Sequence, residues 1–526
     1  MATRQSVAAT AQRYGSRVPV PLRFPLAVYA VLQLIYLVWW AAFFPGLMSY
    51  DSITYVREVT AHHWSSDHSV LYDSFVWLCL KGTGDLWLLT LLQTVAMAAV
   101  VAYTCVALRD LGVRARWSVS AALVLALLPS TGTFTVYVWK DTAFCISVLL
   151  AFAAVIRLVV RVMRGRAALR DRWFYWQLGL LEAGFLGIAL FRNNDIVLVL
   201  AALPLLLFAL RSMRKWLVAL AAATTVVFLA TNFVLYPALG ILRPNITSYY
   251  AFNYADIAVA YKAAPSTFTA ADKAVMEQVA PLSVWRGRAA NCWDVDWTMH
   301  AIDRAAAERL NGQLLTVWWQ VFQRTPQLIA QGHLCRSQIA WGIFAGPKNL
   351  AGNTGISGTV IPANLFEQAD PGRAMEYSPY RPILKTRPLS WKLHSVAAWA
   401  YLFSETPQTQ WIVWRGAFWS YLSYLAVALL AFRWRRPGRP VLGIAAVAFG
   451  AQISIIAANP APIARYILPT IAVGIMTVPL LTLLHRPAPG PDGPEEPDGD
   501  EDEAELSRTG TLEAVATPRP TRIGTG

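Results

Sequence analysis

The fold of this chain is decided around one segment, residues 43–52, which reads Phe-Phe-Pro-Gly-Leu-Met-Ser-Tyr-Asp-Ser. The segment ends a long apolar run and then places the carboxylate of Asp51 a few residues beyond it. A carboxylate held at the edge of a membrane is costly and is a candidate for function. Asp51 could instead cap a helix that begins at Ser52, and this segment alone leaves both interpretations open.

The composition of the whole chain indicates a membrane protein. Of its 526 residues, 56% are hydrophobic and only 14% are charged, whereas soluble domains carry about 25% charged residues. Apolar runs near the roughly 20 residues that a bilayer-spanning helix needs recur along the sequence. The net charge of +14 is typical of basic cytoplasmic loops, and we expect no nucleic-acid partner.

We predict an all-α polytopic protein with about ten transmembrane helices. The expected spans are Phe24–Phe44, Leu86–Leu108, Trp117–Tyr137, Thr142–Val160, Trp176–Phe191, Ile196–Leu210, Trp216–Leu235, Val413–Phe432, Val441–Ala457 and Tyr466–Leu484. With a cytoplasmic N-terminus, every second connection is cytoplasmic. Those connections begin at Arg109, Arg161, Arg211 and Arg433, and all four are basic, as the positive-inside rule requires. This predicts a multi-pass protein of the cell membrane with both termini in the cytoplasm.

The spans divide the chain into five parts. Residues 1–23 form a cytoplasmic segment, 24–236 a seven-helix membrane module, 237–405 an extracytoplasmic helical or irregular segment, 406–486 the C-terminal membrane helices, and 487–526 a disordered acidic cytoplasmic tail. Cys292 and Cys335 fall in the extracytoplasmic segment. Because that compartment is oxidising, the two could form a disulfide, although two free thiols remain the alternative.

The predicted topology places the unusual polar residues on the extracytoplasmic side. These residues are Asp51, Lys140, Asp141, Arg192, Asp195 and Arg465. The three cations have structural alternatives: Lys140 could extend to the interface, Arg192 could pair only with Asp195, and Arg465 could hold the last two spans together. Cations beside a carboxylate can bind a phosphate, and the carboxylate can accept a proton from a hydroxyl. At a membrane edge, this chemistry fits transfer from a lipid-phosphate carrier.

Four short motifs carry a family resemblance. They are Ser49-Tyr50-Asp51-Ser52 in the first outer loop, Asp67-His68 in the same loop, Trp139-Lys140-Asp141 in the second, and Arg465-Tyr466-Ile467-Leu468-Pro469 at the start of the last span. The pattern resembles the GT-C superfamily of integral membrane glycosyltransferases. Members share seven membrane helices, a catalytic aspartate after the first helix, and often a soluble region after the seventh. Ser69 stands where many members have proline after the histidine.

The resemblance implies an inverting glycosyltransferase with a GT-C-like fold. The donor would be a polyprenyl-phosphate or polyprenyl-diphosphate sugar, and the acceptor an extracytoplasmic glycan, lipid or protein of the cell envelope. Asp51 would be the general base. The donor phosphate would be held by Lys140, Arg192 and Arg465, and substrates would be oriented by Asp141, Asn193, His68 and Tyr466.

We expect no cofactor and no metal. Asp51 and Asp141 could share a divalent ion such as Mg²⁺ or Mn²⁺, but Lys140 and the arginines already supply positive charge. Two other functions remain open. A transporter or flippase for an anionic lipid or solute would use the same cations, although no internal repeat is evident. A non-catalytic subunit in envelope synthesis is the third.

Overall fold

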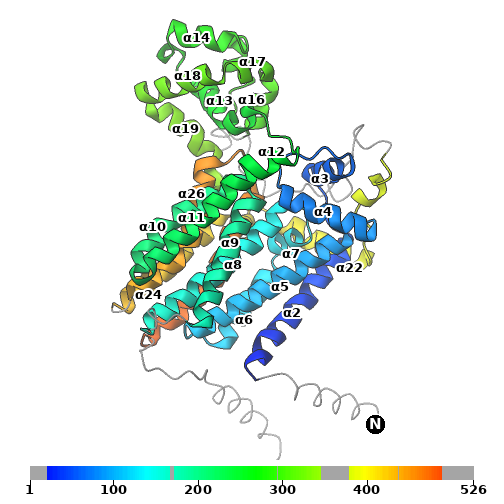
Figure 1. Cartoon of the computed structure of the whole chain (residues 1–526), viewed down its shortest axis with the longest axis vertical. Coiled ribbons are helices and arrows are strands. Elements are labelled where there is room, and N and C mark those ends of the chain that lie inside the picture. Colours follow the sequence, from blue (N-terminus) through cyan, green and yellow to red (C-terminus); the bar gives the residue numbers. More distant parts are fainter. Residues whose placement is uncertain are drawn as a thin grey trace, which may run out of the picture.

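The computed structural model describes residues 20–165, 171–292, 294–344, 378–435, 438–461 and 463–488. Within these ranges the chain is helical, and β-structure is confined to two isolated bridges. The predicted tail from residue 489 onward and the N-terminal segment up to residue 19 lie outside the described residues. Figure 1 shows an elongated bundle of helices with a smaller group of helices at one end.

The bundle is built from long apolar helices, as expected of an all-α multi-pass membrane protein. Among the described residues, eight helical segments are long and apolar enough to cross a membrane. In chain order they are Leu22–Ala42 (in α2, Val20–Ala42), Trp87–Asp110 (α5), Lys140–Met163 (α8), Arg172–Phe191 (α9), Arg211–Ala238 (containing α11, Arg214–Ala230, the π-helical η4, Thr231–Leu235, and α12, Tyr236–Ala238), Gly416–Arg433 (α24), Gly438–Ala458 (containing α26, Ala446–Ala458) and Leu468–His485 (α27, Leu468–Thr477, and η11, Val478–His485).

Two of the ten predicted spans do not form a single long helix. The third span is broken between α6 (Ala115–Leu127) and α7 (Pro129–Thr135), which meet at 69°. Pro129 causes the break because proline forces the preceding residue out of the helical region, and Leu128 is extended with ψ of 127°. The sixth predicted span is a helical stretch of only 17 residues, Asn193–Ala209, with Pro204 inside α10 (Ile196–Ala209).

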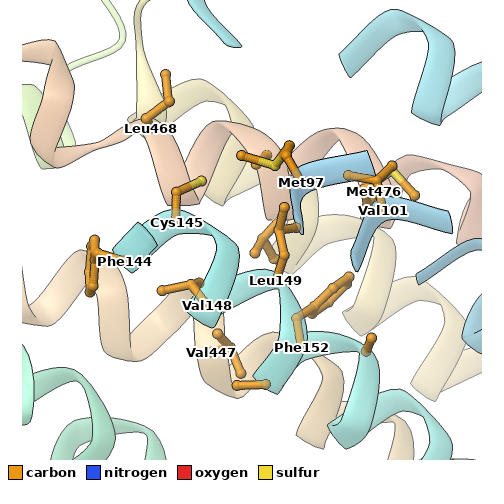
Figure 2. Packing of buried hydrophobic residues seen from close by; sticks show 14 of the residues in the cluster. Met97, Val101, Phe144, Cys145, Val148, Leu149, Phe152, Val447, Leu468 and Met476 are labelled. Carbon is orange, nitrogen blue, oxygen red and sulfur yellow. The ribbon is translucent and has the colours of Figure 1, made fainter. Parts of the chain in front are cut away.

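Helix α8 is the centre of the bundle. In its apolar window 78% of the residues are buried, against 17% for the segment that contains α11. Figure 2 shows Phe144, Val148, Leu149 and Phe152 of α8 among side chains from three other helices, Met97 and Val101 of α5, Val447 of α26, and Leu468 and Met476 of α27. Because α8 begins at Lys140, this packing fixes the position of the polar residues at its first turn.

Residues 246–336 form a helical cap with a hydrophobic core of its own. Its helices are α13 (Ile246–Ala263), α14 (Ala270–Glu277), α15 (Leu282–Arg286), α16 (Val295–Ala301), α17 (Arg304–Arg309), α18 (Asn311–Arg324) and α19 (Pro326–Arg336). Cys292 and Cys335 are joined in a disulfide, with their Cα atoms 5.8 Å apart. Figure 1 shows the cap at the end of the bundle that also carries α3 (Tyr50–Thr60) and α4 (Val70–Thr83).

The chain returns from the cap to the end of α2. The Leu389 amide donates to the carbonyl of Ala41 at 2.9 Å, and the Thr386 hydroxyl donates to that of Gly46 at 3.0 Å. Helix α22 (Trp391–Ser404) then packs against α2 and α7. The outer face of α22 leaves Trp391 69% and Trp399 65% exposed, which is typical of aromatic residues at a membrane interface.

Gly46 is required where the connection between α2 and α3 passes closest to its neighbours. A Cβ atom there would lie 2.6 Å from Thr90 Cγ2 and 2.9 Å from the Val136 carbonyl oxygen. We expect Gly46→Ala to displace the loop and destabilise the protein by about 1–3 kcal/mol, the usual cost of overpacking. Gly82→Ala is the control, since a Cβ there meets nothing within 4 Å. Thermal unfolding in detergent should show a loss for Gly46→Ala only; equal behaviour of the two variants would contradict the close approach.

Candidate functional site

The loop that carries Asp51 is bound directly to the start of α8. The Leu47 amide donates to the Val136 carbonyl, and the Val138 amide donates to the Leu47 carbonyl, each at 3.0 Å. The Ser52 hydroxyl donates to the Val138 carbonyl at 2.9 Å. These bonds join the first and second interhelical connections at backbone level, so Asp51 has a fixed position relative to residues 139–141.

Asp51 is not the residue that caps α3. The N-cap is Ser49, whose hydroxyl accepts a hydrogen bond from the Asp51 amide at 3.2 Å. Ser49 Oγ in turn accepts a hydrogen bond from the Trp139 indole. The capping interpretation of Asp51 is therefore wrong, and its carboxylate is free to interact elsewhere, in the first helical turn where negative charge is favoured.

The carboxylate of Asp51 forms an ion pair with Arg465. The two residues are 414 positions apart in the sequence. The second terminal nitrogen of Arg465 donates to the Tyr466 hydroxyl at 3.0 Å, and the guanidinium lies 5.5 Å from the ring centre of Trp139. The Asp51 and Arg465 side chains are 21% and 18% exposed, so solvent or a ligand can still reach the pair.

A second arginine is held more deeply beside this pair. Arg192 Nε lies 3.3 Å from Asp141 Oδ1, and its Nη1 lies 2.8 Å from Asp195 Oδ2. The Arg192 guanidinium is 4.3 Å from the ring centre of Tyr466. Arg192 and Asp141 are only 8% and 1% exposed, so two carboxylates and an aromatic ring already occupy this arginine. The geometry fits the structural pairing with Asp195 and adds Asp141, which the sequence did not connect to it.

Lys140 and His68 close the other side of the site. Lys140 Nζ lies 3.4 Å from His68 Nδ1, and the His68 ring packs edge-on against Tyr55 with ring centres 5.3 Å apart. Asn193 points instead to the first loop, since its amide donates to the Ser66 carbonyl at 3.1 Å. The structure thus gathers all eight predicted residues at one end of the bundle, with Asp51, Arg465, Lys140 and His68 less buried than Arg192 and Asp141.

The helical cap is fastened to the two connections that supply Asp51 and Arg465. On the first, the Ser66 amide donates to the Leu242 carbonyl at 2.8 Å, just before the cap begins. On the last, the Val295 amide donates to the Pro460 carbonyl at 3.1 Å. The Asn459 amide also donates to the Arg336 carbonyl at 2.8 Å. A movement of the cap would therefore act on the same two connections that hold the ion pair.

The charges of the site set the protonation of its members. Burial alone would raise the pKa of Asp51, but the charges of Arg465 and Lys140 and the hydrogen bond from Arg465 outweigh burial and lower it. Burial, followed by the charge of Lys140, lowers the pKa of His68 to about 3. His68 is therefore neutral at physiological pH and can accept a hydrogen bond from the Lys140 ammonium.

Sequence reasoning missed Tyr55, which packs against His68 of the site, and Glu58, a buried carboxylate on the same helix as Asp51. Glu58 lies seven residues after Asp51, and this spacing puts both on the same face of α3, which was the available signal. Tyr55 is fully buried against His68 and Tyr72, and no sequence pattern marked it. Within the described ranges no three His, Cys, Asp or Glu side chains gather as metal ligands. Asp51 and Asp141 pair with different arginines.

Comparison with known proteins adds no relative. No family model matches the chain, and neither a curated protein nor a solved structure is significantly similar to it.

Glu58 gives the site a predictable pH dependence. Burial, with a smaller contribution from Asp67, raises the pKa of Glu58 to about 7, against an opposing effect of Arg57. The folded state therefore binds more protons than the unfolded state between about pH 4.5 and 7, so stability falls as pH rises through this range. At about 1.4 kcal/mol per pKa unit the loss is on the order of 3 kcal/mol.

Glu58→Gln should remove this dependence. We expect the unfolding temperature of the variant, relative to wild type, to increase from pH 5 to pH 7.5 in detergent, with Glu277→Gln as a control in the cap. Parallel pH profiles of wild type and Glu58→Gln would show that Glu58 does not titrate in this range.

Proposed function

We propose that this protein is an inverting glycosyltransferase of the GT-C type. It would transfer a sugar from a polyprenyl-phosphate or polyprenyl-diphosphate donor to an acceptor on the extracytoplasmic side of the cell membrane. The observation that carries the proposal is the ion pair of Asp51 and Arg465. It unites the two motifs that, in the family resemblance, contribute the base and the phosphate-binding arginine.

The ion pair implies that the donor binds before Asp51 acts as the base. The guanidinium of Arg465 is paired with the Asp51 carboxylate, and this pairing lowers the pKa of the carboxyl and makes it a weak base. A donor phosphate, with at least two non-bridging oxygens that share its negative charge, would compete for Arg465 and draw it from the carboxylate. Donor binding would thereby free Asp51 and raise its pKa, so the base becomes active only when the donor is present.

Transfer then occurs as a single displacement. The acceptor hydroxyl oxygen attacks the anomeric carbon of the donor sugar while its proton passes to a carboxylate oxygen of Asp51. The bond between the anomeric carbon and the phosphate oxygen breaks, and the electron pair leaves with the phosphate. Arg465 and Lys140 stabilise the negative charge that develops on the leaving phosphate, and attack opposite the leaving group inverts the anomeric configuration.

The remaining site residues position these groups. Arg192, Asp141 and Asp195 form a buried charge network whose outer surface is the ring of Tyr466. Tyr466 lies against both guanidinium groups, at 4.3 Å from Arg192 and 5.0 Å from Arg465. Because Arg192 and Asp141 are almost fully enclosed, we assign them to holding Tyr466 and α8 in place, and Lys140 with Arg465 to the phosphate.

The role of Asp51 is tested by Asp51→Asn, which keeps the size of the side chain and removes its basicity. We expect sugar transfer from a labelled polyprenyl-phosphate donor to fall at least about 100-fold, on the scale of general base catalysis. Donor affinity should be equal or higher, because the neutral amide no longer competes with the donor phosphate for Arg465. Glu277→Gln, at an exposed carboxylate in the cap, serves as the control and should retain activity. An active Asp51→Asn protein, or lipid movement without bond cleavage, would favour a transporter instead.

Arg465 should affect donor binding rather than the proton transfer. Arg465→Ala removes a charge-assisted contact of about 1.5–3 kcal/mol, equivalent to roughly a 10- to 150-fold weaker donor affinity. Arg465→Lys should restore only part of this affinity because an ammonium lacks the planar fork. Donor titrations of the purified variants measure the effect. If Arg465 is only a tie between connections, Arg465→Ala will lower thermal stability and leave donor affinity intact.

A further inference from the structure

Arg415 is the most deeply buried arginine among the described residues and the only one of the buried arginines there without a charged partner. Four arginines in the described ranges are buried: Arg161, Arg192, Arg336 and Arg415. Arg161 pairs with Asp171, Arg192 with Asp141 and Asp195, and Arg336 with Asp256. Arg415 is 0% exposed, and none of its three guanidinium nitrogens has a hydrogen-bond partner among the described residues.

A buried guanidinium without a hydrogen-bonding partner requires a negative charge beside it. Burying an ion without pairing it costs several kcal/mol, because the hydration it loses is not replaced. Arginine cannot lose its proton to avoid this cost. The other three buried arginines show how this protein meets the requirement, with a carboxylate in each case. At Arg415 the negative charge has to be supplied from outside the described chain.

The backbone around Arg415 favours the same kind of ligand. Arg415 is the N-cap of α24, an 18-residue helix whose first turn receives no side-chain cap. The amide groups at such a helix end carry partial positive charge and bind anions. An unpaired guanidinium and an uncapped helix N-terminus therefore occur at the same point of the chain.

This point lies beside the connection that carries Arg465 but involves other residues. A Cβ atom on Gly416 would lie 2.8 Å from Ile467 Cβ and 3.1 Å from the Ile467 carbonyl oxygen, so the chain after Arg415 is pressed against the turn that follows Tyr466. The charged residues of the first site have their own partners, as described above. Arg415 has none of them, so it is a separate group at the same end of the bundle.

The surroundings favour a lipid as the source of the anion. Trp414, the residue before Arg415, donates from its indole to the Ser404 hydroxyl at 2.9 Å and packs edge-on against Tyr401, both on α22. The same helix exposes Val396, Trp399 and Phe403 by 65%, 65% and 53%. An apolar surface of this kind suits acyl or polyprenyl chains, whereas the planar fork of arginine suits a phosphate group.

We propose that Arg415 forms a second anion-binding site, which takes the phosphate group of a membrane lipid at the N-terminus of α24. The site does not depend on the sugar-transfer reaction. A lipid bound there would neutralise the guanidinium, while its chains would lie along the exposed face of α22. Occupation of the site would stabilise the contact between α22, α24 and the turn after Tyr466.

The test counts and measures lipid binding to the full purified chain. Native mass spectrometry from a neutral detergent resolves each binding event of a long-chain polyprenyl phosphate, with the uncharged polyprenol and inorganic phosphate as parallel probes. We expect Arg415→Met to weaken one polyprenyl-phosphate binding event at least about tenfold, the lower end of the effect of a charge-assisted hydrogen bond. Arg415→Lys should weaken it less, and Arg309→Met, at an exposed site in the cap, should not change it.

Thermal unfolding without ligand provides the second measurement. Replacing an unpaired buried charge by an apolar side chain should leave the unfolding temperature of Arg415→Met equal to or above that of wild type. Unchanged lipid binding combined with a lower unfolding temperature would overturn the proposal and make Arg415 structural. Should Arg415→Met fail to accumulate, Arg415→Lys retains the charge, and unaltered lipid binding in this variant would overturn the proposal in the same way.

The same binding measurements distinguish lipid phosphate from free phosphate, and the Arg415 site from the site at Arg465. The site would be assigned to free phosphate if the wild-type protein bound inorganic phosphate as tightly as the lipid and if Arg415→Met abolished this binding. Arg465→Ala should leave the Arg415 event intact. Failure of the glycosyltransferase proposal would appear instead as unchanged transfer or donor affinity in the Asp51 and Arg465 variants.

Discussion

The pairing of Asp51 with Arg465 is the constraint on which the arrangement of this end of the protein depends. One partner follows the first long helix and the other precedes the last, so their contact brings the two ends of the helical bundle together. The bond can be maintained because each partner has further support. Ser49 and Ser52 hold the loop before Asp51 to residues 138 and 139, and Tyr466 receives a hydrogen bond from Arg465.

Charge is arranged here in two layers that differ in burial. The inner layer, Arg192 with Asp141 and Asp195, is enclosed, and its charges are paired with one another, which limits the cost of placing ions in an apolar bundle. The outer layer, Asp51 with Arg465 and Lys140 with His68, is about one-fifth exposed at the ion pair and has positive charge in excess. The Tyr466 ring separates the layers and contacts a guanidinium in each. An anion approaching from the cap end meets the outer layer first.

The long helices and the gathering of the charged residues could be predicted from the sequence, but the bends and the ion pairs could not. Hydropathy placed the long helices because length and apolarity are local properties, and the gathering of Asp51, Lys140, Arg192 and Arg465 followed from alternating topology. Hydropathy did not show the bend at Pro129 or the shortness of the helical stretch at 193–209, since both depend on backbone geometry within an apolar run. The sequence could not show which charges pair, Asp141 with Arg192 and Asp51 with Arg465, because the pairing depends on distances in the folded protein. Arg415 was missed because only its surroundings show that it lacks a counter-charge.

The central claim is that a donor phosphate takes Arg465 from Asp51 and thereby frees the catalytic base. The most direct measurement is a cryo-electron microscopy structure of the full chain with a non-transferable phosphonate analogue of a polyprenyl-phosphate sugar. The account predicts the phosphonate oxygens within hydrogen-bonding distance of Arg465 and Lys140, with the Asp51 carboxylate released and facing the anomeric carbon. An analogue bound away from these residues, or bound while the Asp51–Arg465 pair stays closed, would contradict it.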